Sequence, residues 1–289
     1  ASLIDTTMTI AFNKVAVIGA GAMGRGIAQI AAQAGSQVWL YDTQAEAIQK
    51  AKDAVFQVWD SLAAKGRLDD GTVKSYKARL QGASTLNDLQ SCELVVEAIV
   101  ERLDIKKSLF VDLENLLPET AVLVTNTSSL SVTAIAAALK RPEQFAGYHF
   151  FNPVPLMKVV EVIAGLKTSS AVCERLTSFA KQMGHTPVQA NDTPGFIVNH
   201  AGRGYGTEAL RIVSEGVADF ATIDRILRDQ VGFKLGPFDQ TAWLVAADFV
   251  EESGDEIAAA EMRTGMVERQ WVGEGEGDGS GSGSGYGSG

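Results

Sequence analysis

A histidine and a glutamate in two neighbouring apolar segments are the residues best suited to catalysis. His149 lies between aromatic residues, and Glu161 follows in the apolar run 159–163. A carboxylate inside an apolar strand is unfavourable to bury without a partner, and a pair with His149 would satisfy both groups. Glu161 would then fix the imidazole tautomer, so that the other ring nitrogen could take a proton. A lone histidine here could simply be a satisfied core residue, but the pair favours His149 as a catalytic base with Glu161 as its partner.

A glycine-rich segment predicts a nucleotide site. Gly19, Gly21 and Gly24 match G-x-G-x-x-G, directly after the apolar run 15–18 and at the start of a predicted helix. In this setting the first glycine allows a tight turn, the second lets a pyrophosphate approach the backbone, and the third allows close helix–strand packing. Asp42 ends the next strand at the spacing expected for an acid that binds the adenosine ribose, and its charge would repel a 2′-phosphate. We therefore expect NAD rather than NADP.

Two further polar positions are candidates for substrate contacts. Ser128 belongs to the segment Asn126-Thr127-Ser128-Ser129, which follows a predicted strand and could in part be a helix cap. Asn199 lies on an apolar helix, where we expect it to be buried and to need a partner, which a substrate could supply. The remaining histidines, His185 and His200, are isolated from carboxylate or cysteine clusters, so we expect no metal site.

Alternating apolar runs and helical stretches provide the framework for these residues. The runs alternate up to about Asp192 and predict a parallel sheet with helices on both faces, a Rossmann-type doubly wound α/β fold. Thr43 and Glu46 have the spacing of a capping box for a long helix that ends at Gly66. The predicted strands cover residues 15–18, 38–41, 94–98, 122–125, 146–150 and 159–163, and predicted helices include residues 22–34, 103–117 and 131–140.

The character of the chain changes after Pro194-Gly195. Residues 196–216 and 220–230 read as helices, and no convincing strand follows. We predict a nucleotide-binding domain over residues 1–194 and an all-helical domain over residues 195–272. From Gly273 to Gly289 every odd-numbered residue is glycine, which predicts a tail that cannot bury enough apolar surface to fold.

Composition excludes several classes of protein. The formal net charge of −10 disfavours nucleic-acid binding, which needs a basic face. No apolar run approaches the roughly 18 residues of a membrane span. Two cysteines, Cys92 and Cys173, are too few to staple a chain of 289 residues, so we expect reduced thiols and a cytoplasmic protein.

Together these segments resemble the NAD-dependent L-3-hydroxyacyl-CoA dehydrogenases, in particular the bacterial stand-alone members. The resemblance runs from about Lys14 to Phe238 and decays beyond it. The matching segments are Gly19–Gly24, Leu94–Ala98, Asn126–Leu130, His149–Pro153, Val160–Val162, Asp192–Asn199 and Gly236–Phe238.

The resemblance implies a role for each matching residue. His149 would be the catalytic base with Glu161 as its partner, and Ser128 and Asn199 would hold the substrate oxygens. Positions around the nicotinamide half of the cofactor are matched by Glu101, Lys106 and Asn152. The implied reaction is the oxidation of a 3-hydroxyacyl-CoA in fatty-acid β-oxidation or in aromatic or phenylacetate degradation.

The resemblance also implies partners. Members of this family usually dimerise through the helical domain, so we expect a homodimer. Lys65 with Arg67 could attract the anionic coenzyme A, or could be no more than a solvated helix end.

Two other functions compete with this interpretation. A two-domain Rossmann dehydrogenase of β-hydroxy acids would use a catalytic lysine, and the pair of His149 and Glu161 argues against it. A crystallin-like relative without activity would not need Ser128, His149, Glu161 and Asn199, all of which are retained.

Overall fold

The structure, a computed structural model, describes residues 10–233 and 235–239. It divides into two compact units, residues 1–202 and 203–289. The division falls within helix α7 (Val198–Ser214), eight residues beyond the boundary that we predicted after residue 194 (202 − 194 = 8). The predicted helical domain beyond Asp239 and the predicted tail of residues 273–289 lie outside the described residues.

The first unit contains one eight-stranded sheet with the order β3-β2-β1-β4-β5-β6-β7-β8. Every neighbouring pair is parallel except β6 and β7, which are antiparallel. The chain moves outward from β1 to β3 and then returns to place β4 on the other side of β1, which is the switch point of a doubly wound sheet. The strands are β1 (Lys14–Ile18), β2 (Gln37–Tyr41), β3 (Leu80–Gly82), β4 (Leu94–Glu97), β5 (Val122–Thr125), β6 (Phe145–Phe150), β7 (Val159–Ala164) and β8 (Thr186–Asn191).

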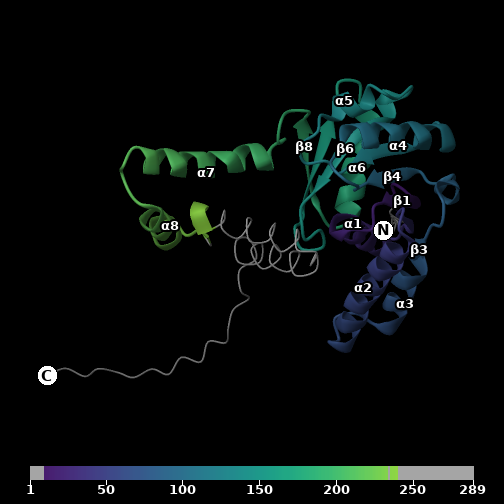
Figure 1. The fold of residues 1–289 in the computed structure, drawn as a ribbon. Coiled ribbons are helices and arrows are strands. Elements are labelled where there is room, and N and C mark those ends of the chain that lie inside the picture. The colour runs from purple at the N-terminus through teal and green to yellow at the C-terminus, as the bar shows by residue number, and fades with distance from the viewer. Residues whose placement is uncertain (1–9, 234, 240–289) are drawn as a thin grey trace, which may run out of the picture. The chain divides into compact units, whose positions relative to one another are not determined.

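Helices cover both faces of this sheet (Figure 1). Val15 and Val17 of β1 belong to the core with α1, α2, α3 and α6, whereas Ala16 and Ile18 belong to the core with α4 and α5. This alternation follows from the two-residue period of a strand, and it explains why residues 15–18 of β1 are all apolar. The helices of this unit are α1 (Ala22–Gln33), α2 (Ala45–Ala64), α3 (Asp70–Arg79), α4 (Leu103–Leu116), α5 (Val132–Ala136) and α6 (Ser170–Gln182), and Leu86–Leu89 and Pro142–Gln144 form 3-10 turns.

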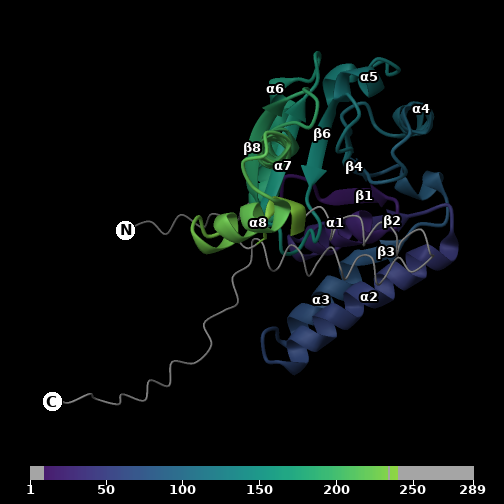
Figure 2. The ribbon, with the colours of Figure 1, turned by 60° about the vertical axis from the view of Figure 1, so that its left-hand side comes forward.

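Two local predictions differ from the structure. Helix α2 begins at Ala45 after Gln44, and Thr43 does not cap it, because the Asp42 carboxylate instead accepts hydrogen bonds from the Gln44 amide and the Thr43 hydroxyl. Helix α5 ends at Ala136, short of the predicted residue 140. Helix α3, which lies beside α2 (Figure 2), buries only Val73 and has no apolar periodicity from which it could have been predicted.

The described part of the second unit is helical. It contains the rest of α7 and α8 (Phe220–Asp229), and these described residues include no strand. Asp224 of α8 accepts hydrogen bonds from the Phe238 and Asp239 amides, which fixes the segment that follows the helix. A mostly parallel, Rossmann-type sheet followed by a helical unit confirms the predicted fold class. No helix in the described part of the chain combines the length and the apolar character needed to span a membrane.

Candidate active site

The turn between β1 and α1 has no room for side chains at two of its glycines. Gly19 has φ +103°, and a Cβ atom there would lie 2.3 Å from the Ala98 carbonyl oxygen. At Gly24 a Cβ atom would lie 1.8 Å from the Gly19 carbonyl oxygen, so this glycine allows α1 to approach the turn. Around Gly21 the structure places nothing within 4 Å of such an atom. The turn is thus closed at its base and open at Gly21, as a pyrophosphate cradle at a helix N-terminus requires.

Asp42 lies at the carboxyl end of β2 and is part of the same turn. Its Oδ2 accepts a hydrogen bond of 2.8 Å from the Ala20 amide, and its Oδ1 accepts one of 3.0 Å from Gln44. Asp42 therefore stabilises the glycine-rich turn in addition to the ribose contact that we predicted for it. Its partly exposed position leaves that contact possible.

The structure brings His149 and Glu161 together. They face each other as register partners across the antiparallel strands β6 and β7, and Nδ1 of His149 lies 2.6 Å from Oε2 of Glu161. Both side chains are buried, at 5% and 0% exposure. Because the carboxylate can only accept, Nδ1 is the donor of this hydrogen bond. In the neutral tautomer that this bond favours, Nε2 is the ring nitrogen that can take a proton. Among the described residues, none hydrogen-bonds to Nε2.

The second oxygen of Glu161 holds the start of α7. Oε1 accepts hydrogen bonds from the Ile197 and Val198 amides, both 2.9 Å long. Burial raises the pKa of the Glu161 carboxyl, but the hydrogen bonds from His149 and from these two amides more than offset burial, so that its pKa lies below the usual value. Glu161 is therefore held as a carboxylate next to the imidazole.

Two aromatic rings restrict the His149 imidazole further. The ring centroid of Phe151 lies 4.6 Å from that of the imidazole, and the ring centroid of Phe196 lies 5.6 Å from it. Phe196 is buried and has φ +49°, a left-handed conformation that is unfavourable for a bulky side chain. Strain of this kind persists where the surrounding structure fixes a segment. Phe196 lies in such a segment, between β8 and α7.

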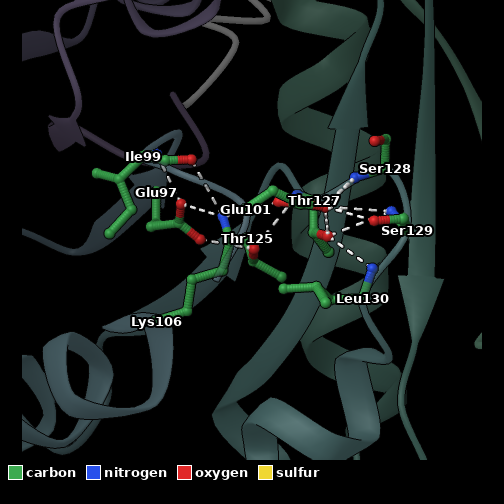
Figure 3. A network of polar contacts seen from close by, with 9 residues as sticks. All are labelled: Glu97, Ile99, Glu101, Lys106, Thr125, Thr127, Ser128, Ser129 and Leu130. Atoms are coloured by element: carbon green, nitrogen blue, oxygen red, sulfur yellow. Dashed lines mark hydrogen bonds and ion pairs between the residues drawn. The ribbon is translucent and has the colours of Figure 1, made fainter. Parts of the chain in front are cut away.

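Ser128 lies in a turn at the carboxyl end of β5. The Glu101 carboxylate accepts hydrogen bonds at Oε1 from the Thr127 hydroxyl, from the Ser128 amide (3.1 Å), and from the amide (3.3 Å) and hydroxyl (3.0 Å) of Ser129 (Figure 3). The Ser128 side chain itself is exposed. Glu101, which we predicted to contact the cofactor, thus anchors the backbone of the turn that presents Ser128.

The other predicted site residues differ in their exposure. Asn199 is exposed on α7 in this structure, which corrects the expectation that it is buried. Lys65 follows the last residue of α2 and is exposed. Asn152 is partly buried after β6 and precedes Pro153 through a cis peptide bond. His185 is buried between the carbonyl oxygens of Val154 and Met183 and therefore has a structural role.

Two polar residues near the site were given no role of their own from the sequence. Asn126 links two strand ends, because its amide N–H donates to the Glu97 carbonyl oxygen and its Oδ1 accepts from the Phe150 amide next to His149. Glu97 is a fully buried carboxylate in β4, and the argument that identified Glu161 inside an apolar strand applies to it equally. In the described part of the chain, no group of three or more potential ligand residues could hold a metal ion.

In a comparison with known proteins, both parts of the chain match sequence models of one family. Residues 14–193 match the sequence model of the 3-hydroxyacyl-CoA dehydrogenase NAD binding domain, and residues 195–281 match that of the 3-hydroxyacyl-CoA dehydrogenase C-terminal domain. The second match extends past Phe238, where we had expected the resemblance to decay.

Individual relatives are similar over most of the chain. The 3-hydroxyadipyl-CoA dehydrogenase of Escherichia coli is 46% identical over 234 residues, which are 81% of this chain and 49% of that protein. A probable 3-hydroxybutyryl-CoA dehydrogenase of Deinococcus radiodurans is 41% identical over 237 residues, which are 82% of this chain and 83% of that protein.

Solved structures show the same similarity in three dimensions. The (S)-3-hydroxybutyryl-CoA dehydrogenase of Ralstonia eutropha has a TM-score of 0.76 at 32% identity, and the match covers 88% of this chain and 87% of that one. The 3-hydroxybutyryl-CoA dehydrogenase of Escherichia coli has a TM-score of 0.77 at 42% identity, covering 86% of this chain and 52% of that one. The chain thus spans about half the length of the Escherichia coli proteins that it matches. It belongs to the 3-hydroxyacyl-CoA dehydrogenase family and carries the NAD-binding domain of that family.

Proposed function

We propose that this protein oxidises L-3-hydroxyacyl-CoA to 3-oxoacyl-CoA with NAD. The observation that carries the proposal is the buried pair of His149 and Glu161, which leaves Nε2 of the imidazole available as a base. Family membership supplies the reaction class, and the pair supplies the group that moves the proton. Bound NAD would accept the hydride from C3 of the substrate.

In this proposal each side chain has a separate role in the reaction. Nε2 of His149 takes the proton of the 3-hydroxyl group, and Glu161 stabilises the imidazolium that forms. Ser128 and Asn199 hold the substrate oxygens. In the reverse direction the imidazolium returns its proton to the forming alkoxide.

The residues present fit the cofactor. Gly21 leaves the backbone open at the N-terminus of α1, where a pyrophosphate binds N–H groups. Asp42 would bind the adenosine ribose, and Gly19 and Gly24 would shape the turn. Glu101, Lys106 and Asn152 are proposed to lie around the nicotinamide half.

The partners and location of the protein are also proposals. We infer a homodimer through the helical unit, a contact between Lys65 and coenzyme A, and a cytoplasmic protein that does not bind nucleic acid. The net charge of −10 supports the absence of nucleic-acid binding, because binding the phosphates of a nucleic acid needs a surface of basic residues.

NADH formation from acyl-CoA substrates tests the proposed function. The assay compares 3-hydroxybutyryl-CoA and 3-hydroxyadipyl-CoA, the substrate classes in the names of the relatives, with free 3-hydroxybutyrate. We expect turnover with a CoA thioester, and a loss of about 10²–10⁴-fold in kcat for His149→Gln with NADH binding unchanged.

His200→Gln is the matched control, because His200 is exposed and its ring contacts only the Pro194 carbonyl oxygen among the described residues. It should keep its activity. An absence of turnover with any CoA thioester would refute the proposed activity and favour a crystallin-like relative. Turnover of the free acid alone would favour a β-hydroxy-acid dehydrogenase.

A further inference from the structure

A buried ion pair lies behind the turn that carries Ser128. Glu97, the last residue of β4, is 0% exposed, and Lys106 of α4 is 1% exposed. Nζ of Lys106 lies 2.5 Å from Oε1 of Glu97. A charge removed from water to this degree is tolerated only with a partner and further hydrogen bonds. Glu97 has them, because Oε1 also accepts from the Ile99 amide (2.7 Å) and Oε2 accepts from the Thr125 hydroxyl (2.7 Å).

Lys106 connects this pair to Glu101. Its ammonium group lies 3.3 Å from Oε2 of Glu101, on the other side from Glu97, and 3.4 Å from the Ile99 carbonyl oxygen (Figure 3). The three charges therefore alternate from the strand outward, with one cation between two carboxylates. Lys106 thus contacts the buried Glu97 on one side and the more exposed Glu101 on the other.

Glu101 connects Lys106 to the turn that carries Ser128. One of its oxygens receives Lys106, and the other receives four donors from Thr127, Ser128 and Ser129. Burial raises the pKa of the Glu101 carboxyl, but the hydrogen bond from Thr127 and the charge of Lys106 more than offset it, so that its pKa lies below the usual value. The nearby Arg102 pairs with Asp104 instead of Glu101. Glu101 thus remains a carboxylate, which acts only as an acceptor toward these donors.

A second path joins Glu97 to the same turn. The Thr125 hydroxyl donates to Glu97 and lies 3.3 Å from the Thr127 amide, whose hydrogen bond it accepts. The Thr127 hydroxyl in turn accepts from the Ser129 and Leu130 amides. Both paths begin at Glu97 and end on the backbone around Ser128.

We propose that Glu97 is a positioning residue that holds Lys106 against Glu101 and thereby sets the place of Ser128. The inference rests on the proposed function, in which Ser128 holds a substrate oxygen beside His149. A displacement of such a group by about 1 Å can reduce the rate about 10²-fold. Glu97 itself touches neither substrate nor cofactor in this proposal and acts through Lys106 and the turn.

Variants that separate stability from positioning test the proposal. Glu97→Gln leaves the buried Lys106 without its full countercharge, so both the Tm and kcat should fall. The double variant Glu97→Gln with Lys106→Met removes both charges, and a neutral pair of similar shape is tolerated far better than a lone buried charge. We expect the Tm to recover in the double variant while kcat stays about 10²-fold below wild type. The NADH dissociation constant of the single variant Glu97→Gln should stay at the wild-type value, because Glu97 itself does not touch the cofactor.

Glu114→Gln is the matched control on the other end of α4. Glu114 is also buried, accepts hydrogen bonds from the Lys140 and Arg141 amides, and pairs with the Arg141 guanidinium. Its replacement should lower the Tm and leave kcat unchanged. Recovery of kcat together with the Tm in the double variant would overturn the proposal, as would a loss of NADH affinity in Glu97→Gln that parallels its loss of kcat.

Amide hydrogen exchange separates this inference from the proposed function. In the double variant the Ser128 and Ser129 amides should exchange about tenfold faster than in wild type, which corresponds to the loss of one net hydrogen bond. If wild type turns over no CoA thioester, the proposed function fails, and this comparison still decides the role of Glu97. Exchange equal to that of Glu114→Gln would show that the pair has no influence on the turn.

Discussion

Glu97 and Glu161 are both fully buried carboxylates of the same sheet, but their partners differ. Glu97 faces the ammonium of Lys106 together with one amide and one hydroxyl. Glu161 faces an imidazole and two amides at the start of α7. A carboxylate with a fixed cation keeps its surroundings unchanged during a reaction. A carboxylate beside an imidazole can stabilise a charge that appears and disappears. The first arrangement suits positioning and the second suits proton transfer.

Replacement of Glu161 should give the largest difference between the two carboxylates. In Glu161→Gln only one side-chain oxygen remains, whereas His149 Nδ1 and the two α7 amides require acceptors on both sides. The new amide group must therefore direct its N–H bonds at one of these donors. We expect kcat to fall by about 10³-fold or more, as in other triads whose orienting acid becomes an amide.

Steady-state kinetics and NADH binding measure this effect. Glu114→Gln again provides the control, because its carboxylate also accepts amide hydrogen bonds at both oxygens but lies away from His149. If Glu161→Gln reduced kcat no more than Glu97→Gln does, the proposed distinction between proton transfer and positioning would be wrong.

The stability of the protein in acid should also differ, by a smaller amount, between wild type and Glu161→Gln. The pKa of Glu161 in the folded protein is below its usual value of 4.5. The ionised group therefore stabilises the fold above pH 4.5, and this contribution is lost as the pH falls through the lower, folded-state pKa. We expect the free energy of unfolding, measured by urea denaturation, to fall less steeply below pH 4.5 in Glu161→Gln than in wild type. Equal slopes would show that Glu161 does not stabilise the fold through its charge.

The sequence contained enough to predict His149 and Glu161 as a pair but not the network around Glu97. The pair lies in one antiparallel hairpin, where an unusual carboxylate has a single plausible partner. The partners of Glu97 come from α4 and β5, and only the crossover connections bring them together. Residues on different crossover units share no spacing that a sequence pattern could reveal.

The same reasoning explains which elements were predicted. Buried central strands such as β1 and β4 contain uninterrupted apolar runs, residues 15–18 and 94–96, and were identified from them. Strand β8 was missed because it is an edge strand, largely exposed, with Pro187 inside it. Asn199 was expected to be buried because its helix is apolar, yet α7 leaves it exposed.

The smallest expected effect concerns Thr125, the second path from Glu97 to the turn. Thr125→Val keeps the shape of the side chain but removes the donor to Glu97 Oε2 and the acceptor of the Thr127 amide. Lys106 still compensates the charge of Glu97, so we expect a loss of about 1–2 kcal/mol in the free energy of unfolding and a decrease in kcat of only a few-fold. Thr177→Val is the matched control, because the buried Thr177 hydroxyl has no hydrogen-bond partner among the described residues, and its removal should be neutral or stabilising. Urea denaturation of both variants measures the difference. Equal stability of the two would mean that the hydroxyl of Thr125 contributes nothing to the network, so that Glu97 would act on Ser128 through Lys106 and Glu101 alone.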